Sequence, residues 1–317
     1  MATNNPIEHI VIIFKENHTF DNYFGTFPGA NGVSGLQRVS DPPLSDHPHT
    51  HKAWLNRNNN PVKEQYIEAD IPNYFALAKQ FSLCDNYFTD VAGPSTPNHL
   101  MVIAGDSPII DNPHPKDLSQ PQPPYNLPSL PMQLEKAGLS WKSYGSYAHQ
   151  YISELAKSPN NVGSSTFTLD ASNGNLPNVS WLYGGKGSSE HPVESVAQGE
   201  KWTMEQIKAI VQGGLWGKTA IFITWDDWSG WFDHLTPPQS EKWTDGTQFR
   251  YGSRVGCIVV SPYAKTGYIS TVQHSHVSLV KFSETIFNLP SLNQRVTAAD
   301  DMLDCFDFKQ KPYSHLA

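Results

Sequence analysis

One short apolar run near the start of the chain constrains the fold more than any other feature. Residues 10–14 read Ile-Val-Ile-Ile-Phe, with no polar residue in alternation. Such a run predicts a strand buried on both faces, over about residues 8–15. It stops at Lys15, and Glu16 and Asn17 follow. Ligands of open α/β sheets bind beyond the carboxyl ends of the strands, so these two residues are candidates for a site. The alternative is that Glu16 is a solvated loop residue and Asn17 caps the next helix.

Two further apolar runs predict buried strands, at residues 219–225 and 255–260. The first of them ends in acids, Asp226 and Asp227. Shorter strands are expected at 81–88, 141–144 and 179–182, and helices at 72–81, 129–137, 203–211 and 276–287, the third of these capped by Thr203. Strands that alternate with helices predict an α/β fold with a mainly parallel central sheet and helices on both faces.

The remaining segments, 25–66, 106–128 and much of 157–200, are expected to be loops or irregular structure. They contain no internal repeat and no clear linker. We therefore expect residues 1–317 to form a single domain with long loops that carry or cover a site.

Composition and charge narrow the class of protein. The net charge of -8 and the pI near 5.9 argue against a nucleic-acid-binding protein. Residues 1–6 contain no apolar core of a signal peptide, and no run is long enough to cross a bilayer. A soluble chain is expected, with secretion left open if a signal was trimmed; the sequence leaves the oligomeric state and the compartment open.

The three cysteines, Cys84, Cys257 and Cys305, lie far apart in the sequence. None is part of a C-x-x-C pair, so no thiolate zinc site is expected. Cys257 lies inside an apolar run and is expected in the core. The sequence does not decide whether two of the three cysteines form a disulfide.

The acids at the two strand ends suggest a metal site. If both strands are parallel in one sheet, Glu16, Asn17, Asp226 and Asp227 meet at one edge. Close carboxylates repel one another and their pKa values rise, and a divalent cation removes this repulsion. Oxygen ligands suit a hard ion such as Ca²⁺, Mg²⁺ or Mn²⁺. The alternatives are two unrelated loop acids, one of them a helix cap, or a mixed histidine and carboxylate Zn²⁺ site.

Ser95 is the best candidate for a nucleophile. It lies in the turn Gly-Pro-Ser-Thr-Pro-Asn of residues 93–98 and is expected at the N-cap of a short helix. N–H groups at a helix start favour a phosphate, and a divalent ion acidifies a bound hydroxyl. Ser95 as a simple cap and Thr96 as the nucleophile are the alternatives. Asn98 is expected either to donate to a phosphoryl oxygen or to hold the turn.

Five histidines in the expected loops are candidates for proton transfer or phosphate binding. Each has a structural role as its alternative. They are His47, His49, His51, His191 and His234, while His18 and His99 lie beside the motifs and face either solvent or core.

Three stretches taken together resemble the bacterial phospholipase C and acid phosphatase family of phosphoesterases, which has an alkaline-phosphatase-like fold. Residues 16–25 are similar to E-N-R-S-F-D-x-Y-F-G, residues 93–99 to G-P-T-x-P-N-R, and residues 224–234 to T-[YW]-D-E-x-G-G-x-x-D-H. His191-Pro192 and residues 254–262 resemble two shorter family motifs. The resemblance runs from about residue 8 to residue 292.

The resemblance implies a metal-dependent phosphoesterase. Glu16, Asn17, Asp226 and Asp227 would hold the divalent cation (Ca²⁺, Mg²⁺, Mn²⁺ or Zn²⁺), and Ser95 would be the nucleophile. His191 and His234 would contact the phosphate or the leaving group, and substrate binding is expected from Asn98, His49 and His51.

The substrate class implied first is a phospholipid, cleaved in the manner of phospholipase C, with transient contact to a membrane surface. A broad acid phosphomonoesterase and a non-enzymatic metal-binding protein are the alternatives. The chain departs from the family pattern at several positions. Among them, with the family residue in parentheses, are His18 (Arg), Ser95 (Thr), His99 (Arg), Asp227 (Glu) and Ser229 (Gly).

Overall fold

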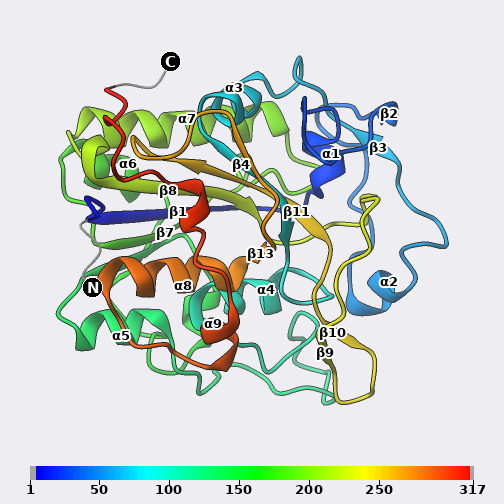
Figure 1. Cartoon of the computed structure of the whole chain (residues 1–317). Helices are drawn as coiled ribbons and strands as arrows, with labels where there is room; N and C mark the ends of the chain where they lie inside the picture. The colour runs from blue at the N-terminus through cyan, green and yellow to red at the C-terminus, as the bar shows by residue number, and fades with distance from the viewer. Residues whose placement is uncertain (1–4, 315–317) are drawn as a thin grey trace.

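The computed structural model describes residues 5–314, which build a central nine-stranded sheet (Figure 1). The strand order is β12-β4-β11-β8-β1-β7-β5-β6, and β13 pairs with β4. Every pairing in this sheet is parallel except those of β11, which is antiparallel to β4 and to β8. The predicted α/β fold with a mainly parallel sheet is confirmed. The strands are β1 (His9–Lys15), β4 (Ser82–Phe88), β5 (Trp141–Tyr144), β6 (Asn161–Val162), β7 (Val179–Tyr183), β8 (Thr219–Trp225), β11 (Arg254–Val260), β12 (Tyr268–Ser270) and β13 (His274–Ser275).

The apolar run that opened the sequence forms β1, between β7 and β8. Its residues 10–14 are almost completely buried because helices cover both faces of the sheet. Parallel pairing sets Ile13 opposite Ile223 and Lys15 opposite Trp225. β1 and β8 therefore end at the same level, and the polar residues that follow each strand meet at one edge.

Helices cover both faces of the sheet: α3, α6 and α7 lie above it in Figure 1, and α4, α5 and α8 lie below it. The helices are α1 (Phe20–Phe24), α2 (His51–Leu55), α3 (Pro72–Gln80), α4 (Ser95–Ala104), α5 (Leu130–Lys136), α6 (Thr166–Ser172), α7 (Val196–Gln212), α8 (His276–Phe287) and α9 (Gln294–Ala298). Short 3-10 turns are η1 (Ala148–Tyr151), η2 (Trp216–Lys218) and η3 (Leu303–Cys305).

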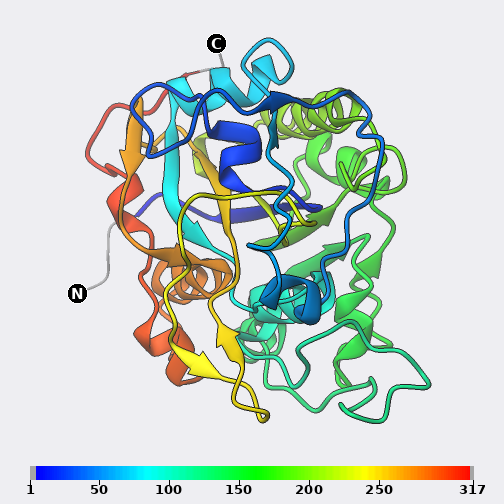
Figure 2. The ribbon, with the colours of Figure 1, turned by 90° about the vertical axis from the view of Figure 1, so that its right-hand side faces the viewer.

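The long segment between α1 and α3 crosses the side of the molecule where β1 ends (Figure 2). It contains α2 and the paired two-residue strands β2 (Gln37–Arg38) and β3 (Glu64–Gln65). A second small pair, β9 (Glu241–Lys242) with β10 (Gln248–Arg250), lies between β8 and β11 in the chain. As expected from the sequence, the segment 25–66 is mostly loop.

Two helix starts differ from the prediction. α7 begins at Val196, where the Ser195 hydroxyl accepts from the Gln198 N–H, so the predicted cap at Thr203 is wrong. The buried Thr203 hydroxyl instead donates to the Gly199 carbonyl within the helix. Ser95 is the first residue of α4 and not its cap, because Pro94 occupies the N-cap position.

The single domain over residues 1–317 stays a prediction. Residues 1–4, part of the segment read for a signal peptide, lie outside the described residues. Within residues 5–314, no helix is both long and apolar enough to span a membrane.

Candidate active site

The two strand ends are joined directly by main-chain and side-chain hydrogen bonds. The Asp226 N–H donates to the Lys15 carbonyl (3.0 Å), and the Asn17 N–H donates to Asp226 Oδ1 (2.9 Å). Asn17 has φ 66°, a left-handed conformation that Asn adopts more readily than most residues. The structure thus places Glu16 Oε2 and Asp226 Oδ1 beside the Asn17 amide, and Asp227 follows Asp226 in the chain. We call the four predicted metal ligands, Glu16, Asn17, Asp226 and Asp227, the clamp.

The clamp concentrates negative charge in a buried place. Burial and the Asp226 charge raise the pKa of Glu16, and the same two causes raise the pKa of Asp227 to about 7. Burial also acts to raise the pKa of Asp226, but the hydrogen bond and charge of His99 outweigh it and hold that pKa at about 2. Like-charge repulsion of this kind is what a bound cation relieves.

His99 is the contact that sequence reasoning missed. Its Nε2 lies 3.2 Å from Asp226 Oδ2 and 3.5 Å from Glu16 Oε1. Burial lowers the pKa of His99, yet these two carboxylates outweigh burial and raise it to about 9. The ring stacks on Tyr183, with centroids 5.1 Å apart. One feature of the sequence could have indicated that His99 contacts the carboxylates. His99 ends the second motif, at the position where the family has a basic residue.

Ser95 faces the clamp from the first turn of α4. Its Oγ donates to Asp227 Oδ2 at 3.0 Å, and the residue is buried. The hydroxyl does not serve as a helix cap, because Pro94 occupies the N-cap position. The neighbouring Thr96 hydroxyl instead lies 3.2 Å from the Tyr147 hydroxyl.

Asn98 holds the turn that presents Ser95. Its side-chain oxygen accepts from the Val91 N–H (2.8 Å), and its nitrogen donates to the carbonyls of Val91 and Pro94. The residue is completely buried. Of the two roles considered from the sequence, the structure places Asn98 in the structural one, away from the predicted contact with substrate.

His49 and His191 lie on the outer side of the clamp, with ring centroids 6.0 Å apart. They and Asp46 each offer a ligand atom within 4.8 Å of the others. Burial lowers the pKa of both imidazoles, but Asp227 beside His49 and Glu16 beside His191 outweigh burial, and both pKa values are raised. Asp46, which the sequence analysis did not single out, accepts from the Ser229 hydroxyl at 3.1 Å.

A hollow of about 300 Å³ opens beside the His49 imidazole. It is lined by His49 and Asp46 and by Pro94, the residue before Ser95. Ser229 belongs to the same region and has φ 41°, which explains why a glycine suits that motif position.

Two further histidines predicted for the site contact other groups than the clamp residues. His51 is buried, with Nδ1 2.6 Å from the Ala92 carbonyl and Nε2 2.9 Å from Thr247 Oγ1. His234 Nδ1 lies 2.7 Å from Asp21 Oδ2, within a network around the buried Arg254. Both imidazoles are engaged in structural contacts, so neither the substrate-binding role of His51 nor the leaving-group role of His234 finds support in its position.

A buried ion pair fixes the approach of His191 to the end of β1. Lys15 Nζ lies 3.1 Å from Glu190 Oε1, and both side chains are fully buried. Glu190 also accepts from the Tyr23 and Tyr74 hydroxyls and from the Trp225 indole. The last residue of β1 thereby holds the segment that carries His191.

The donor set fits a divalent cation. The Asn17 side-chain oxygen faces only acceptors, Glu16 Oε2 and Asp226 Oδ1. Turned round, the amide nitrogen would donate to these atoms at 3.2 and 3.0 Å, and the oxygen would accept from His191 Nε2 at 3.1 Å. A cation bound between the oxygens of Asn17, Glu16 and Asp226 would favour the orientation in which the Asn17 oxygen faces the two carboxylates. The cation would then supply the positive charge that these three oxygens lack.

The family model described as "Phosphoesterase family" matches residues 7–53 and 41–290 of this chain. The chain is 27% identical to the non-hemolytic phospholipase C of Pseudomonas aeruginosa, over 95% of this chain and 57% of that protein. It is 26% identical to phospholipase C B of Mycobacterium tuberculosis, over 96% of this chain and 78% of that protein. The chain thus spans little more than half the length of some of these relatives.

Solved structures with low sequence identity share the fold. Murine ectonucleotide pyrophosphatase/phosphodiesterase 5 matches with a TM-score of 0.53 at 9% identity, over 94% of this chain and all of that one. A sulfatase from Pseudoalteromonas matches with a TM-score of 0.52 at 11% identity, over 93% of this chain and 72% of that one. The chain therefore belongs to the Phosphoesterase family, is homologous to bacterial phospholipases C and has the alkaline-phosphatase-like fold.

Proposed function

We propose that this protein is a metal-dependent phosphoric ester hydrolase that cleaves phospholipids in the manner of phospholipase C, with Ser95 as its nucleophile. The observation that carries the proposal is the position of Ser95 Oγ. It lies 3.0 Å from Asp227 Oδ2, at a helix start that faces the four clamp residues. Nearness to phospholipases C in sequence supports the choice of substrate class.

Ser95 Oγ would attack phosphorus, forming a serine phosphoester while the bond from phosphorus to the diacylglycerol oxygen breaks. Asp227 Oδ2 accepts the hydrogen bond of this hydroxyl and is the nearest acceptor for its proton. His49 or His191 would give a proton to the leaving oxygen, since their raised pKa values keep more of each imidazole protonated. Water would then hydrolyse the phosphoester and release the phosphorylated head group.

The clamp, Glu16, Asn17, Asp226 and Asp227, would hold the metal, with Ser95 beside it. A bound divalent cation would stabilise negative charge on the nucleophile and on a phosphoryl oxygen. The predominance of oxygen donors favours a hard ion, Ca²⁺, Mg²⁺ or Mn²⁺, over Zn²⁺. His99 would balance the charge of Asp226 and Glu16 from the inner side.

The test is an assay of the full chain on phosphatidylcholine and on p-nitrophenyl phosphate, with the released head group identified. Ser95→Ala is expected to lower kcat by roughly 10³-fold or more. Thr96→Ala is the matched control, because that neighbouring hydroxyl faces Tyr147, and it should keep activity within a few-fold. Chelation should abolish turnover, and adding back Ca²⁺, Mg²⁺, Mn²⁺ and Zn²⁺ one at a time should identify the ion.

Full activity of Ser95→Ala would refute the nucleophile, and full activity after chelation would refute the metal. Turnover of the monoester alone would move the assignment to an acid phosphomonoesterase. No turnover of either substrate by metal-loaded protein would favour a metal-binding protein without this activity.

A further inference from the structure

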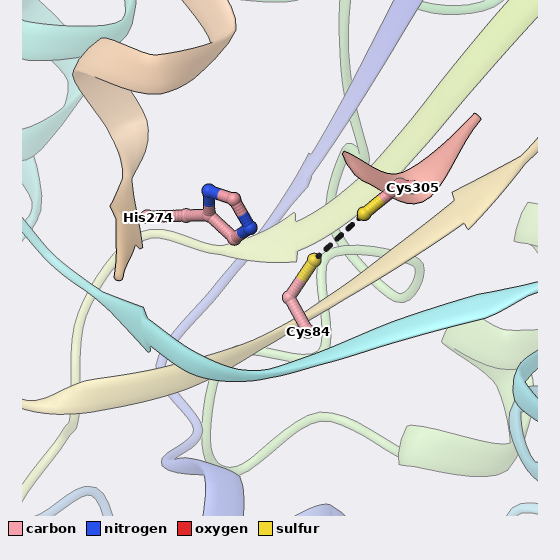
Figure 3. A group of neighbouring side chains, drawn as sticks. All are labelled: Cys84, His274 and Cys305. Atoms are coloured by element: carbon pink, nitrogen blue, oxygen red, sulfur yellow. Dashed lines mark hydrogen bonds between the residues drawn. The ribbon is translucent and has the colours of Figure 1, made fainter. Parts of the chain in front are cut away.

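A second group of potential metal ligands lies away from the clamp and consists of two thiols and an imidazole (Figure 3). Cys84 comes from β4, His274 from β13 and Cys305 from η3. Each offers a ligand atom within 4.8 Å of the other two, and all three side chains are buried. Both cysteines are free thiols.

The spacing of the sulfurs is that of two thiolates on one zinc ion. Cys84 Sγ and Cys305 Sγ lie 3.7 Å apart. Two thiolates at about 2.3 Å from a tetrahedral Zn²⁺ are separated by roughly 3.8 Å. A disulfide would bring the sulfurs to about 2 Å, so the observed spacing fits a shared ion without movement of either side chain.

His274 lies between two carboxylates and a hydroxyl. Its Nδ1 lies 3.1 Å from Asp300 Oδ1, and carboxylates near the second ring nitrogen are common beside ligating imidazoles. Its Nε2 lies 3.0 Å from the Ser270 hydroxyl, which a bound ion would have to displace. Its Nε2 lies 3.5 Å from Asp304 Oδ1, which is also 3.7 Å from Cys305 Sγ. In Figure 3 the edge of the imidazole points toward the two sulfurs. The partly buried Asp304 thus offers an oxygen near two of the three ligand atoms, on the side that is partly exposed to solvent.

We propose that Cys84, His274 and Cys305, completed by Asp304, bind a Zn²⁺ ion that ties the C-terminal segment to the central sheet. Thiolate and imidazole ligands suit Zn²⁺, whereas the clamp offers no sulfur. Burial raises the pKa of the Cys84 thiol well above its ordinary value, so ion binding has to release a proton. The sequence argued against a thiolate zinc site because it has no C-x-x-C pair, but these ligands come from three separate segments.

Cobalt is the probe that separates this site from the clamp. Reduced full-length protein is titrated with Co²⁺ without oxygen, and a thiolate-to-cobalt charge-transfer band should grow to one equivalent. Added Zn²⁺ should bleach it. Cys84→Ser and Cys305→Ser should abolish the band. Cys257→Ser is the matched control, since Cys257 is a buried thiol opposite Cys84 in the sheet but outside the ligand group, and it should keep the band.

A second measurement on the wild-type chain covers the case in which the serine variants do not fold. Zn²⁺ should slow alkylation of Cys84 and Cys305 at least tenfold, and Mg²⁺ should not. A folded, reduced wild-type protein without a thiolate-to-cobalt band would overturn the proposal, as would an unchanged band in Cys84→Ser and Cys305→Ser. A Cys84–Cys305 disulfide in protein kept under reductant would overturn it too. These results are independent of hydrolase activity, so failure of the proposed function leaves them unaffected.

Discussion

Replacing Glu190 with Gln tests whether the buried ion pair at the end of β1 holds the site together. Lys15 and Glu190 are both fully buried, 3.1 Å apart. The variant keeps the shape of the side chain but removes its charge, which leaves the buried Lys15 ammonium without its ion-pair partner. Removing one partner of a buried pair costs about 3–5 kcal/mol of unfolding free energy.

The expected shift in melting temperature follows from the size of the chain. An unfolding entropy of about 2.1 cal/mol/K per residue gives about 0.7 kcal/mol/K for 317 residues. A loss of 3–5 kcal/mol therefore lowers Tm by about 4–8 °C. Because His191 directly follows Glu190, kcat/KM for the phosphoester substrate should also fall at temperatures where the variant is folded.

Differential scanning calorimetry at neutral pH measures the shift. Glu8→Gln is the matched control, because its pair with Lys218 has the similar distance of 2.9 Å but both side chains are more than half exposed. An exposed pair contributes about 0–1 kcal/mol, so this control should lose no more than about 1–2 °C. Lys15→Met combined with Glu190→Gln should recover part of the loss. Equal Tm values for Glu190→Gln and wild type would refute the reasoning.

Three other predictions concern the protonation of Asp227 and the roles of His191 and His234. Asp227 has a folded pKa raised to about 7, so the metal-free folded state binds more protons than the unfolded state between about pH 4 and 7. The unfolding free energy of the metal-free protein should therefore fall as pH rises through this window, and it should fall less steeply in Asp227→Asn. Urea unfolding in the presence of chelator measures this free energy at each pH. Parallel curves of unfolding free energy against pH for the variant and the wild type would contradict the prediction. His191→Gln should lower kcat at least ~10²-fold. His234→Gln, which loses the contact with Asp21, should lower Tm but keep kcat within a few-fold, and equal kcat losses would contradict that assignment.

The clamp was predictable because it depends on one local pattern and one general rule. Runs of buried residues marked β1 and β8, and strand ends in parallel sheets meet at one edge. The register that sets Lys15 opposite Trp225 then brings Glu16 and Asp226 together. The turn of residues 93–98 indicated that Ser95 is exposed at a helix start. The prediction placed it at the N-cap, whereas Ser95 is the first residue of α4.

The loop histidines were not predictable from local pattern. His51 and His234 are positioned by Thr247 and Asp21, which lie 196 and 213 residues away in the chain. The early start of α7 differs from these cases, because Ser195 caps it locally by accepting from the Gln198 N–H, a signal that the prediction overlooked. Glu200 in its first turns also accepts from the Tyr74 N–H, which adds a tertiary contact. Contacts of this range depend on the folded sheet and not on neighbouring residues.

The central claim is that the residues after β1 and β8 form one metal site beside Ser95. The most direct test is a crystal structure of Mn²⁺-loaded, active protein with anomalous data at the manganese edge. We predict a strong peak bounded by Glu16, Asn17, Asp226 and Asp227, within coordination distance of Ser95 Oγ. Manganese peaks confined to other parts of an enzyme that is active with Mn²⁺ would contradict the account.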